Sequence, residues 1–366
     1  MRKIKLGVIG LGGIAQGVHL PGIAACKDLE LTAICDINEE TLNKVGDRWG
    51  IDPKRRFLNH LDLLACPEVE AVDIATPNDC HFQLAMDVAS ARKPYALEKP
   101  VTMTAQEADL LAAHTKAMGV KSMVCFSYRF KTAARCARDY IRQGLLGEIY
   151  HVDMQYFQGW GLPEADRPLA WRFQKARARS GAFADLGCHA LDLVRFVTEK
   201  EYTKIVSHAD TYVKQRRLPC GGGFGQVDVD DFCNYLAQME DGISASFQIT
   251  RFAFGRANYQ RMEVYGSKGA LIYTLDGDIP NADELEICIG NAAGETKTFT
   301  KVNRFPQQYR ADQMQSFADI IAGRGDGLAA TIEDGRINQH VCDAVITSFE
   351  EERWVAIDKN IAEGKA

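Results

Sequence analysis

The sequence predicts an α/β domain followed by an α+β domain, with a doubly wound parallel sheet in the first and a large, mostly antiparallel sheet in the second. Between residues 3 and 126, short apolar runs alternate with helical stretches of about 10–15 residues, which is typical of parallel strands joined by right-handed crossovers. Between residues 202 and 302, strand patterns instead follow one another directly. The chain has 366 residues, enough for two hydrophobic cores. We therefore expect domains at 1–126 and 127–366.

The first predicted strand, residues 3–10, runs into a glycine-rich turn. Gly10, Gly12 and Ala15 form the pattern G-x-G-x-x-A, and a helix is expected over 14–26. Gly10 permits the tight turn, Gly12 lets the backbone approach a pyrophosphate, and Ala15 keeps the helix close to the strand. The amides at the start of the helix favour negative charge. The turn therefore predicts a dinucleotide site, whose expected residues are Gly10, Gly12, Gly13, Ile14 and Ala15.

The second predicted strand, residues 29–35, ends on Asp36, at the spacing where an acid meets the ribose hydroxyls of the adenosine half. Ile37 and Asn38 follow, and neither is a basic residue that would accept a 2′-phosphate. We therefore expect NAD rather than NADP, with Asp36 and Ile37 at the ribose. The alternative is that Asp36 or Asn38 only caps the helix that begins near Glu39.

Three further predicted strands of this domain, over 71–75, 95–99 and 121–126, end in polar residues. Parallel strands share one carboxyl edge, where open α/β sheets bind ligands, so these side chains are expected to meet there. A helix is predicted from near His81. Lys99 alone could be a surface lysine, but its neighbours favour a place beside the nicotinamide. The cofactor-side residues expected from this edge are Thr76, Pro77, Asn78, His81, Glu98, Lys99 and Arg129.

The second domain is expected to build a broad sheet. An Asp241-Gly242 pair between two strand patterns is a strong hairpin signal. The helix predicted over 185–197 can cover one face of the sheet, and the other face is a candidate contact between subunits. The expected strands are 148–157, 232–239, 243–252, 262–265, 270–275, 285–289 and 297–302, and the other helices are 132–143, 309–322 and 333–355.

The helix at 185–197 carries three ionisable residues. Asp185, His189 and Asp192 are four and three residues apart, which places them on one helix face. Hydride transfer from a carbinol requires loss of the hydroxyl proton, and a histidine can take it near neutral pH. Asp185 can orient His189, and Lys99 can offset the negative charge of the alkoxide. The structural alternative for His189 is a core histidine. For Asp192 two roles stay open, which are binding a substrate hydroxyl and only stabilising the helix.

Jointly these motifs resemble the Gfo/Idh/MocA oxidoreductases, a family named for glucose–fructose oxidoreductase, inositol dehydrogenase and rhizopine catabolism protein. The likeness covers essentially the whole chain and includes the segment 263–269. It implies a Rossmann domain, a C-terminal domain on a large sheet, and homo-oligomers (dimers, tetramers or larger) assembled through the open sheet face. It assigns catalysis to Lys99, Asp185 and His189. The residues expected at the substrate are Lys99, Tyr128, Trp160, Trp171, Arg172, Asp185, His189 and Tyr309.

The resemblance implies NAD-dependent oxidation of a secondary hydroxyl of a sugar or glycoside, with C3 of a glucoside suggested by the breadth of the family and by no residue here. Three alternatives stay open: an inositol dehydrogenase, a redox-neutral NAD-dependent glycosidase or lyase, and a non-catalytic NAD-binding regulator. The regulator would not need Lys99, Asp185 and His189 together. Whether Lys99 or His189 is the base is also open at this stage.

Composition limits other classes of function. The formal net charge of −6 leaves no basic footprint for nucleic acid or an anionic membrane. The first apolar run is interrupted by glycines, unlike a signal peptide, and no run reaches the ~18 apolar residues of a membrane span. The eleven cysteines form no Cys-x-x-Cys pair, which favours a reducing cytoplasm over a zinc site. We expect a cytoplasmic protein without a metal, and a solvated position for Arg251, Arg256 and Arg261.

Overall fold

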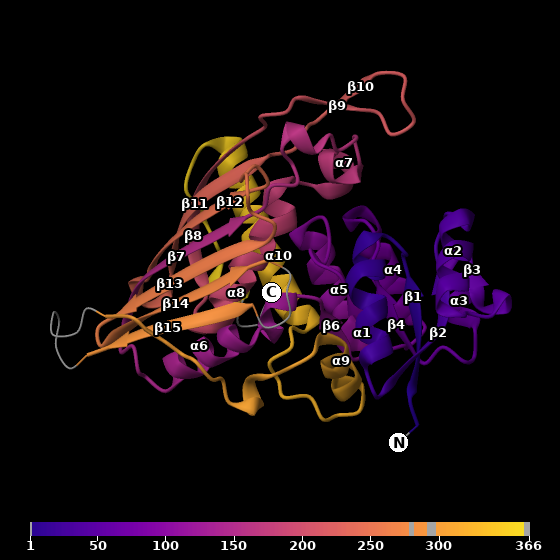
Figure 1. The fold of residues 1–366 in the computed structure, drawn as a ribbon, viewed down its shortest axis with the longest axis horizontal. Helices are drawn as coiled ribbons and strands as arrows, with labels where there is room; N and C mark the ends of the chain where they lie inside the picture. The colour runs from indigo at the N-terminus through magenta and orange to yellow at the C-terminus, as the bar shows by residue number, and fades with distance from the viewer. Residues whose placement is uncertain (1, 278–281, 291–297, 362–366) are drawn as a thin grey trace. The chain divides into compact units, whose positions relative to one another are not determined.

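The computed structural model describes residues 2–277, 282–290 and 298–361, and the chain forms two compact units (Figure 1). The first unit contains the chain up to Ser127 together with Ala311–Arg336. The second contains Tyr128–Arg310 and the chain from Ile337 onward. Each unit has its own sheet. In the described part of the chain, no helix combines the length and apolarity needed to cross a membrane.

The sheet of the first unit has six strands in the order β3-β2-β1-β4-β5-β6, and every pair is parallel. This order confirms the predicted doubly wound sheet, with its switch point between β1 and β4. The two-residue strand β3 carries too short a pattern to be predicted. The strands are β1 (Ile4–Ile9), β2 (Leu29–Cys35), β3 (Arg56–Phe57), β4 (Ala71–Ile74), β5 (Tyr95–Leu97) and β6 (Ser122–Val124).

Helices cover this sheet, and local sequence signals set where several of them begin. Thr104 accepts a hydrogen bond from the Glu107 amide and so caps the start of α5. Helix α4 begins at Asn78, earlier than the predicted start near His81, because Pro77 is a suitable residue just before the first turn. The helices are η1 (Ala15–His19), α1 (Leu20–Ala25), α2 (Glu39–Trp49), η2 (Pro53–Arg55), α3 (His60–Ala65), α4 (Asn78–Ser90), α5 (Ala105–Met118) and α9 (Gln313–Ile321). Helix η3 (Ser127–Phe130) begins at the last residue of this segment and continues into the second unit.

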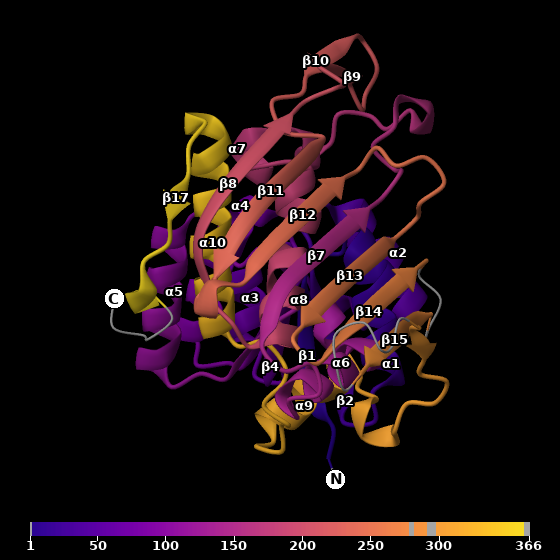
Figure 2. The same ribbon diagram turned by 90° about the vertical axis from the view of Figure 1, so that its left-hand side faces the viewer.

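The second unit is built on a nine-stranded sheet in the order β16-β15-β14-β13-β7-β12-β11-β8-β17, seen face-on in Figure 2. Every neighbouring pair is antiparallel except β7 with β12, so the predicted mostly antiparallel sheet is confirmed. The strands are β7 (Ile149–Phe157), β8 (Tyr202–Asp210), β11 (Phe232–Met239), β12 (Ser244–Thr250), β13 (Tyr259–Gly266), β14 (Gly269–Asp276), β15 (Asp283–Ile289), β16 (Thr300–Lys301) and β17 (Val355–Ala356).

Two turns of this unit test the sequence signals. Asp241 and Gly242 both have positive φ, at 57° and 79°, which confirms the predicted hairpin turn between β11 and β12. The loop 218–223 connects the strands of a small hairpin, β9 (Gln215–Arg217) and β10 (Phe224–Gln226). For β16, the predicted start at residue 297 lies outside the described residues.

Helices α8 and α6 pack on one face of the large sheet, as predicted for the 185–197 segment (Figure 2). Along β11, Cys233, Tyr235 and Ala237 are buried on this side, whereas Asn234, Leu236 and Gln238 on the opposite face are exposed. The helices are α6 (Thr132–Arg142), η4 (Pro163–Ala165), η5 (Trp171–Phe173), α7 (Lys175–Ala178), η6 (Phe183–Gly187), α8 (Cys188–Thr198), η7 (Glu240–Gly242), η8 (Gln307–Tyr309), α10 (Ile332–Glu351) and η9 (Lys359–Ile361).

Candidate active site

The glycine turn after β1 has the shape that a dinucleotide requires. Gly10 has φ +90°, and a Cβ there would lie 2.7 Å from the carbonyl oxygen of Ala75, so only glycine fits between the ends of β1 and β4. At Gly12 and Gly13 a Cβ would meet nothing within 4 Å. The turn is therefore tight on the sheet side and open on the other, where backbone amides can approach a pyrophosphate.

Asp36 is tied to this turn. Its Oδ2 accepts a hydrogen bond from the Leu11 amide at 2.8 Å, and its Oδ1 accepts one from the Asn38 amide at 2.8 Å. The helix cap is Asn38, whose Oδ1 accepts from the Thr41 amide, so the capping alternative applies to Asn38 and not to Asp36. Ile37 is 92% exposed beside the acid. A carboxylate with an apolar and an amide neighbour suits ribose hydroxyls and repels a 2′-phosphate.

The loops after β4 and β5 meet at His81. Its Nδ1 lies 2.7 Å from the Pro100 carbonyl oxygen and its Nε2 lies 3.0 Å from that of Thr76. The ring is fully buried, and burial lowers the pKa of His81 against the opposing effect of the two carbonyl contacts. His81 therefore joins the loop after β4 to the loop after β5. The Thr76 hydroxyl is buried without a hydrogen-bond partner among the described residues, as expected of a group kept for a ligand.

Glu98 and Lys99 follow β5 at the carboxyl edge of the sheet. The Glu98 amide donates to the Ile74 carbonyl at 2.9 Å, which continues the pairing with β4 for one more residue. Glu98 is 8% exposed, and its Oε2 accepts from the Lys99 amide at 3.1 Å. Together with the glycine turn, Asp36 and Thr76, these residues form a site in the first unit that fits NAD.

In the second unit, Asp185 and His189 lie on a helix that contains a π-helical turn, η6, before α8. The π turn was not predicted, and such turns are frequent at functional sites because they displace side chains from the regular helix faces. His189 is 7% exposed, and its ring packs edge-on against Tyr128 with centroids 4.8 Å apart. The Tyr128 hydroxyl is hydrogen-bonded to that of Tyr156. Burial raises the pKa of Tyr156 well above 10, so this phenol stays neutral.

Arg172 joins this group from η5. Its Nε lies 3.7 Å from Asp185 Oδ1, and its guanidinium lies over the Trp171 ring, 4.3 Å from the centroid. The second unit therefore brings together Tyr128, His189, Asp185 and Arg172, four of the residues predicted from sequence to face the substrate.

Arg129 and Asp192 form a buried ion pair. Arg129 Nε lies 2.9 Å from Asp192 Oδ2, and its Nη2 lies 2.6 Å from Oδ1. Arg129 is 5% exposed and Asp192 is 1% exposed. The structure therefore favours the helix-stabilising role of Asp192, because the pair ties the 127–130 segment to α8.

Two other predicted residues make contacts of a different kind. Trp160 is half-buried, donates from Nε1 to Gln158 Oε1 at 2.7 Å, and packs on the Phe173 ring, which are the contacts of a loop anchor. The Tyr309 hydroxyl donates to Asp139 Oδ2 of α6 at 2.5 Å.

A buried network around Asp230 was missed from sequence. The Asp230 carboxylate accepts from the amides of Gly181 at 2.6 Å and Phe183 at 2.8 Å, and from the Ser180 hydroxyl. It thereby fixes the entrance of η6. Arg251 donates to the Asp230 carbonyl at 2.9 Å and is 0% exposed, so its predicted solvated position is wrong. Its partners come from elsewhere in the chain, which residue spacing does not reveal.

Comparison with known proteins agrees with this architecture. Residues 4–126 match an oxidoreductase family with an NAD-binding Rossmann fold, and residues 134–272 match the GFO/IDH/MocA C-terminal domain. The chain is 27% identical to the levoglucosan dehydrogenase of Pseudarthrobacter phenanthrenivorans, over 98% of this chain and 99% of that protein. It is 30% identical to the rhizopine catabolism protein MocA of Rhizobium meliloti, over 74% of this chain and 78% of that protein.

A solved structure of levoglucosan dehydrogenase in complex with NADH and L-sorbose matches with a TM-score of 0.86 and 27% identity, over 98% of this chain and 100% of that one. The matches to both halves confirm the resemblance drawn from the sequence motifs. The chain belongs to the Gfo/Idh/MocA family of oxidoreductases, whose N-terminal domain is an NAD-binding Rossmann fold.

Proposed function

We propose that the protein is an NAD-dependent dehydrogenase that oxidises a secondary hydroxyl group of a sugar or glycoside. The first unit binds the cofactor and the second unit binds the substrate. The observation that carries the proposal is the grouping of Asp185, His189, Tyr128 and Arg172 in a chain whose first unit holds a dinucleotide turn. The relatives named levoglucosan dehydrogenase support a ring hydroxyl as the reacting group.

Three residues carry the proposed chemistry. NAD supplies the hydride acceptor when bound. His189 accepts the proton of the hydroxyl group, and Asp185, one π turn earlier, stabilises the resulting imidazolium. Lys99 holds the substrate oxygen and offsets its negative charge. In the alternative assignment, Lys99 is the base in place of His189. Comparing the pH profiles of kcat in Lys99→Arg and His189→Gln distinguishes these two assignments.

A panel of levoglucosan, glucose, an aryl glucoside and myo-inositol tests the function through NADH absorbance. We expect stoichiometric NADH with at least one pyranose, and we propose C3 of a glucoside as the oxidised position, which NMR of the product would report. Release of the aglycone without net NADH would instead favour the redox-neutral glycosidase or lyase. NADH binding without turnover on any member would contradict the dehydrogenase.

The ribose role of Asp36 makes a separate prediction. Asp36→Ala should raise the dissociation constant of NADH about 10- to 100-fold, because hydrogen bonds to a charged group contribute roughly 1.5–3 kcal/mol. NADPH should bind no worse, since the repulsion of its 2′-phosphate is removed. Titration by NADH fluorescence measures both. Glu39→Ala, an exposed acid in the first turn of α2, is the control and should leave NADH affinity unchanged. Equal NADH affinities in the wild type, Asp36→Ala and Glu39→Ala would contradict the ribose role of Asp36.

We also propose that the open face of the large sheet is a homo-oligomer contact. Leu236 on β11 is 51% exposed there, and a broad exposed sheet face is a candidate interface. Leu236→Arg should lower the mass measured by light scattering. Leu110→Arg is the matched control, because Leu110 is 59% exposed on α5 of the other unit. A wild-type mass in Leu236→Arg, or a monomeric wild type, would contradict the proposal.

The cysteines support a proposal about location. All eleven are free, and Cys26, Cys35, Cys125 and Cys233 are buried in the cores. Free thiols persist in a reducing compartment, so we propose the cytoplasm as the site of action.

A further inference from the structure

His19, at the end of η1, is a buried histidine with both ring nitrogens on carboxylate oxygens. Nδ1 lies 2.8 Å from Asp73 Oδ2, and Nε2 lies 2.9 Å from Glu98 Oε1. The residue is 0% exposed. An ionised carboxylate only accepts hydrogen bonds, so both contacts are satisfied only when both ring nitrogens carry protons. The geometry therefore selects the imidazolium form of His19.

Glu98 contacts both His19 and the backbone of Lys99. While its Oε1 faces His19, its Oε2 accepts from the Lys99 amide at 3.1 Å. Beyond Lys99, the Pro100 carbonyl oxygen lies 2.7 Å from His81 Nδ1. The backbone from which the Lys99 side chain departs is thus fastened on both sides through buried histidines.

We propose that His19 is a positioning residue for the reaction: its ring fixes the Glu98 carboxylate, and Glu98 fixes the peptide that carries Lys99. The inference rests on the proposed catalytic role of Lys99. A lysine side chain has four rotatable bonds, so the direction of its backbone sets which positions its amine can reach. Because η1 follows the glycine turn directly, the same histidine joins the cofactor-binding segment to the lysine turn.

The charged groups around the ring also favour the imidazolium form of His19. Burial alone would lower the pKa of His19, but the charge and hydrogen bond of Asp73, and then those of Glu98, outweigh it and raise the pKa from 6.5 to about 10. The Cys125 thiol, one residue after the end of β6, also lies beside the ring. The stability that the charged ring contributes is therefore fully present below pH 6.5 and is lost as the pH rises toward 10.

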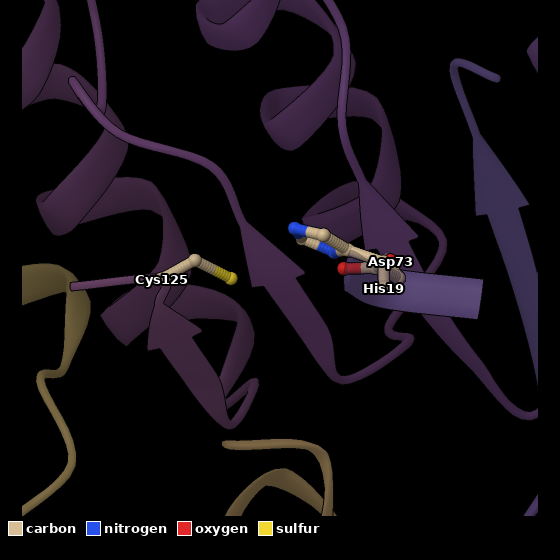
Figure 3. A group of neighbouring side chains, drawn as sticks. All are labelled: His19, Asp73 and Cys125. Atoms are coloured by element: carbon tan, nitrogen blue, oxygen red, sulfur yellow. The ribbon is translucent and has the colours of Figure 1, made fainter. Parts of the chain in front are cut away.

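A metal ion is the competing occupant of this cluster. His19, Asp73 and Cys125 offer ligand atoms within 4.8 Å of one another, and Figure 3 shows the Asp73 carboxylate beside the ring and the Cys125 sulfur directed toward it. A metal would need a free lone pair on a ring nitrogen, whereas both nitrogens face carboxylates. Burial, reinforced by Glu98 and Asp73, raises the pKa of the Cys125 thiol well above 9, which opposes a thiolate ligand.

Two near-isosteric variants separate the two contacts of His19. In His19→Gln the amide nitrogen replaces Nε2 and keeps the donor to Glu98. In His19→Asn the amide nitrogen replaces Nδ1 and keeps only the donor to Asp73. We expect kcat to fall about 100-fold in His19→Asn and about tenfold or less in His19→Gln, with NADH affinity close to wild type in both. Equal losses of kcat, or a loss confined to KM, would overturn the proposal.

A readout independent of turnover separates this inference from the proposed function. Hydrogen exchange of the Lys99 amide should accelerate in His19→Asn relative to His19→Gln, and imidazole ¹⁵N shifts at pH 8 should show a doubly protonated His19 in the wild type. Equal exchange, or a neutral ring at that pH, would overturn the proposal whatever the enzyme oxidises. If no sugar is oxidised, the proposed dehydrogenase function is wrong. Hydrogen exchange of the Lys99 amide still decides whether His19 positions this backbone.

Cys125→Ala is the matched control within the same cluster. Cys125 offers a sulfur to the cluster, and its backbone amide still donates to the Leu97 carbonyl after substitution. We expect wild-type kcat and no metal by elemental analysis. A stoichiometric metal in the wild type that is lost together with activity in Cys125→Ala would replace the positioning role with a metal site.

Discussion

His189→Ala should lower kcat by about 100- to 10,000-fold, the range that a general base contributes. The substituted enzyme would have to release the hydroxyl proton to water while the hydride departs. Lys99→Ala should lower kcat by about 100- to 1,000-fold, because the alkoxide loses its neighbouring cation. The dissociation constant of NADH should stay close to wild type in both variants, since the glycine turn and Asp36 are unchanged. Steady-state kinetics and NADH fluorescence measure these quantities.

Two exposed residues of the same types are suitable controls: Lys116 on α5 and His208 on β8. Alanine at either position should leave kcat unchanged. If Lys99 and His189 act in the same step, the double variant should lose less than the product of the two single losses. Near-normal kcat in both Lys99→Ala and His189→Ala would remove the catalytic assignment, and a parallel loss of NADH affinity would point to a binding role instead.

Much of the fold could be predicted because its signals are local. The glycine turn at Gly10 and the Asp241-Gly242 hairpin each depend on residues a few positions apart, and both are found where predicted. The period of the apolar residues likewise distinguishes the parallel sheet from the consecutive strands. The two-residue strands β3 and β17 leave no such pattern, and they were missed.

The positions of the two key histidines could not be derived from helical spacing. His19 ends one π turn and His189 follows another, and neither π turn was predicted. The four-residue spacing of Asp185 and His189 predicts a regular α-helix between them, whereas the π turn η6 includes Asp185 and ends two residues before His189. Buried charges were missed for a different reason. Arg251 is neutralised by Asp231, twenty residues away, so its own sequence neighbours suggest an exposed residue.

The largest expected effect on stability is that of Asp230→Ala, about 3–5 kcal/mol of the free energy of unfolding. The carboxylate accepts from two backbone amides and a hydroxyl, and it is 7% exposed. Its loss leaves three buried donors without this partner. A Cβ at Gly181 would lie 1.9 Å from the Asp230 carbonyl oxygen, which shows how closely the two segments approach.

Asp228→Ala is the matched control, because Asp228 lies two residues earlier and accepts one exposed amide, that of Lys175. It should cost less than about 1 kcal/mol in urea unfolding. Asp230→Asn, which keeps one acceptor oxygen, should fall between the two. The Asp230 variants should also lose kcat in the order of their instability, since the segment that they loosen leads into the turn bearing Asp185. Equal stability of Asp230→Ala and Asp228→Ala would mean that η6 is held by its packing against the sheet and not by this carboxylate.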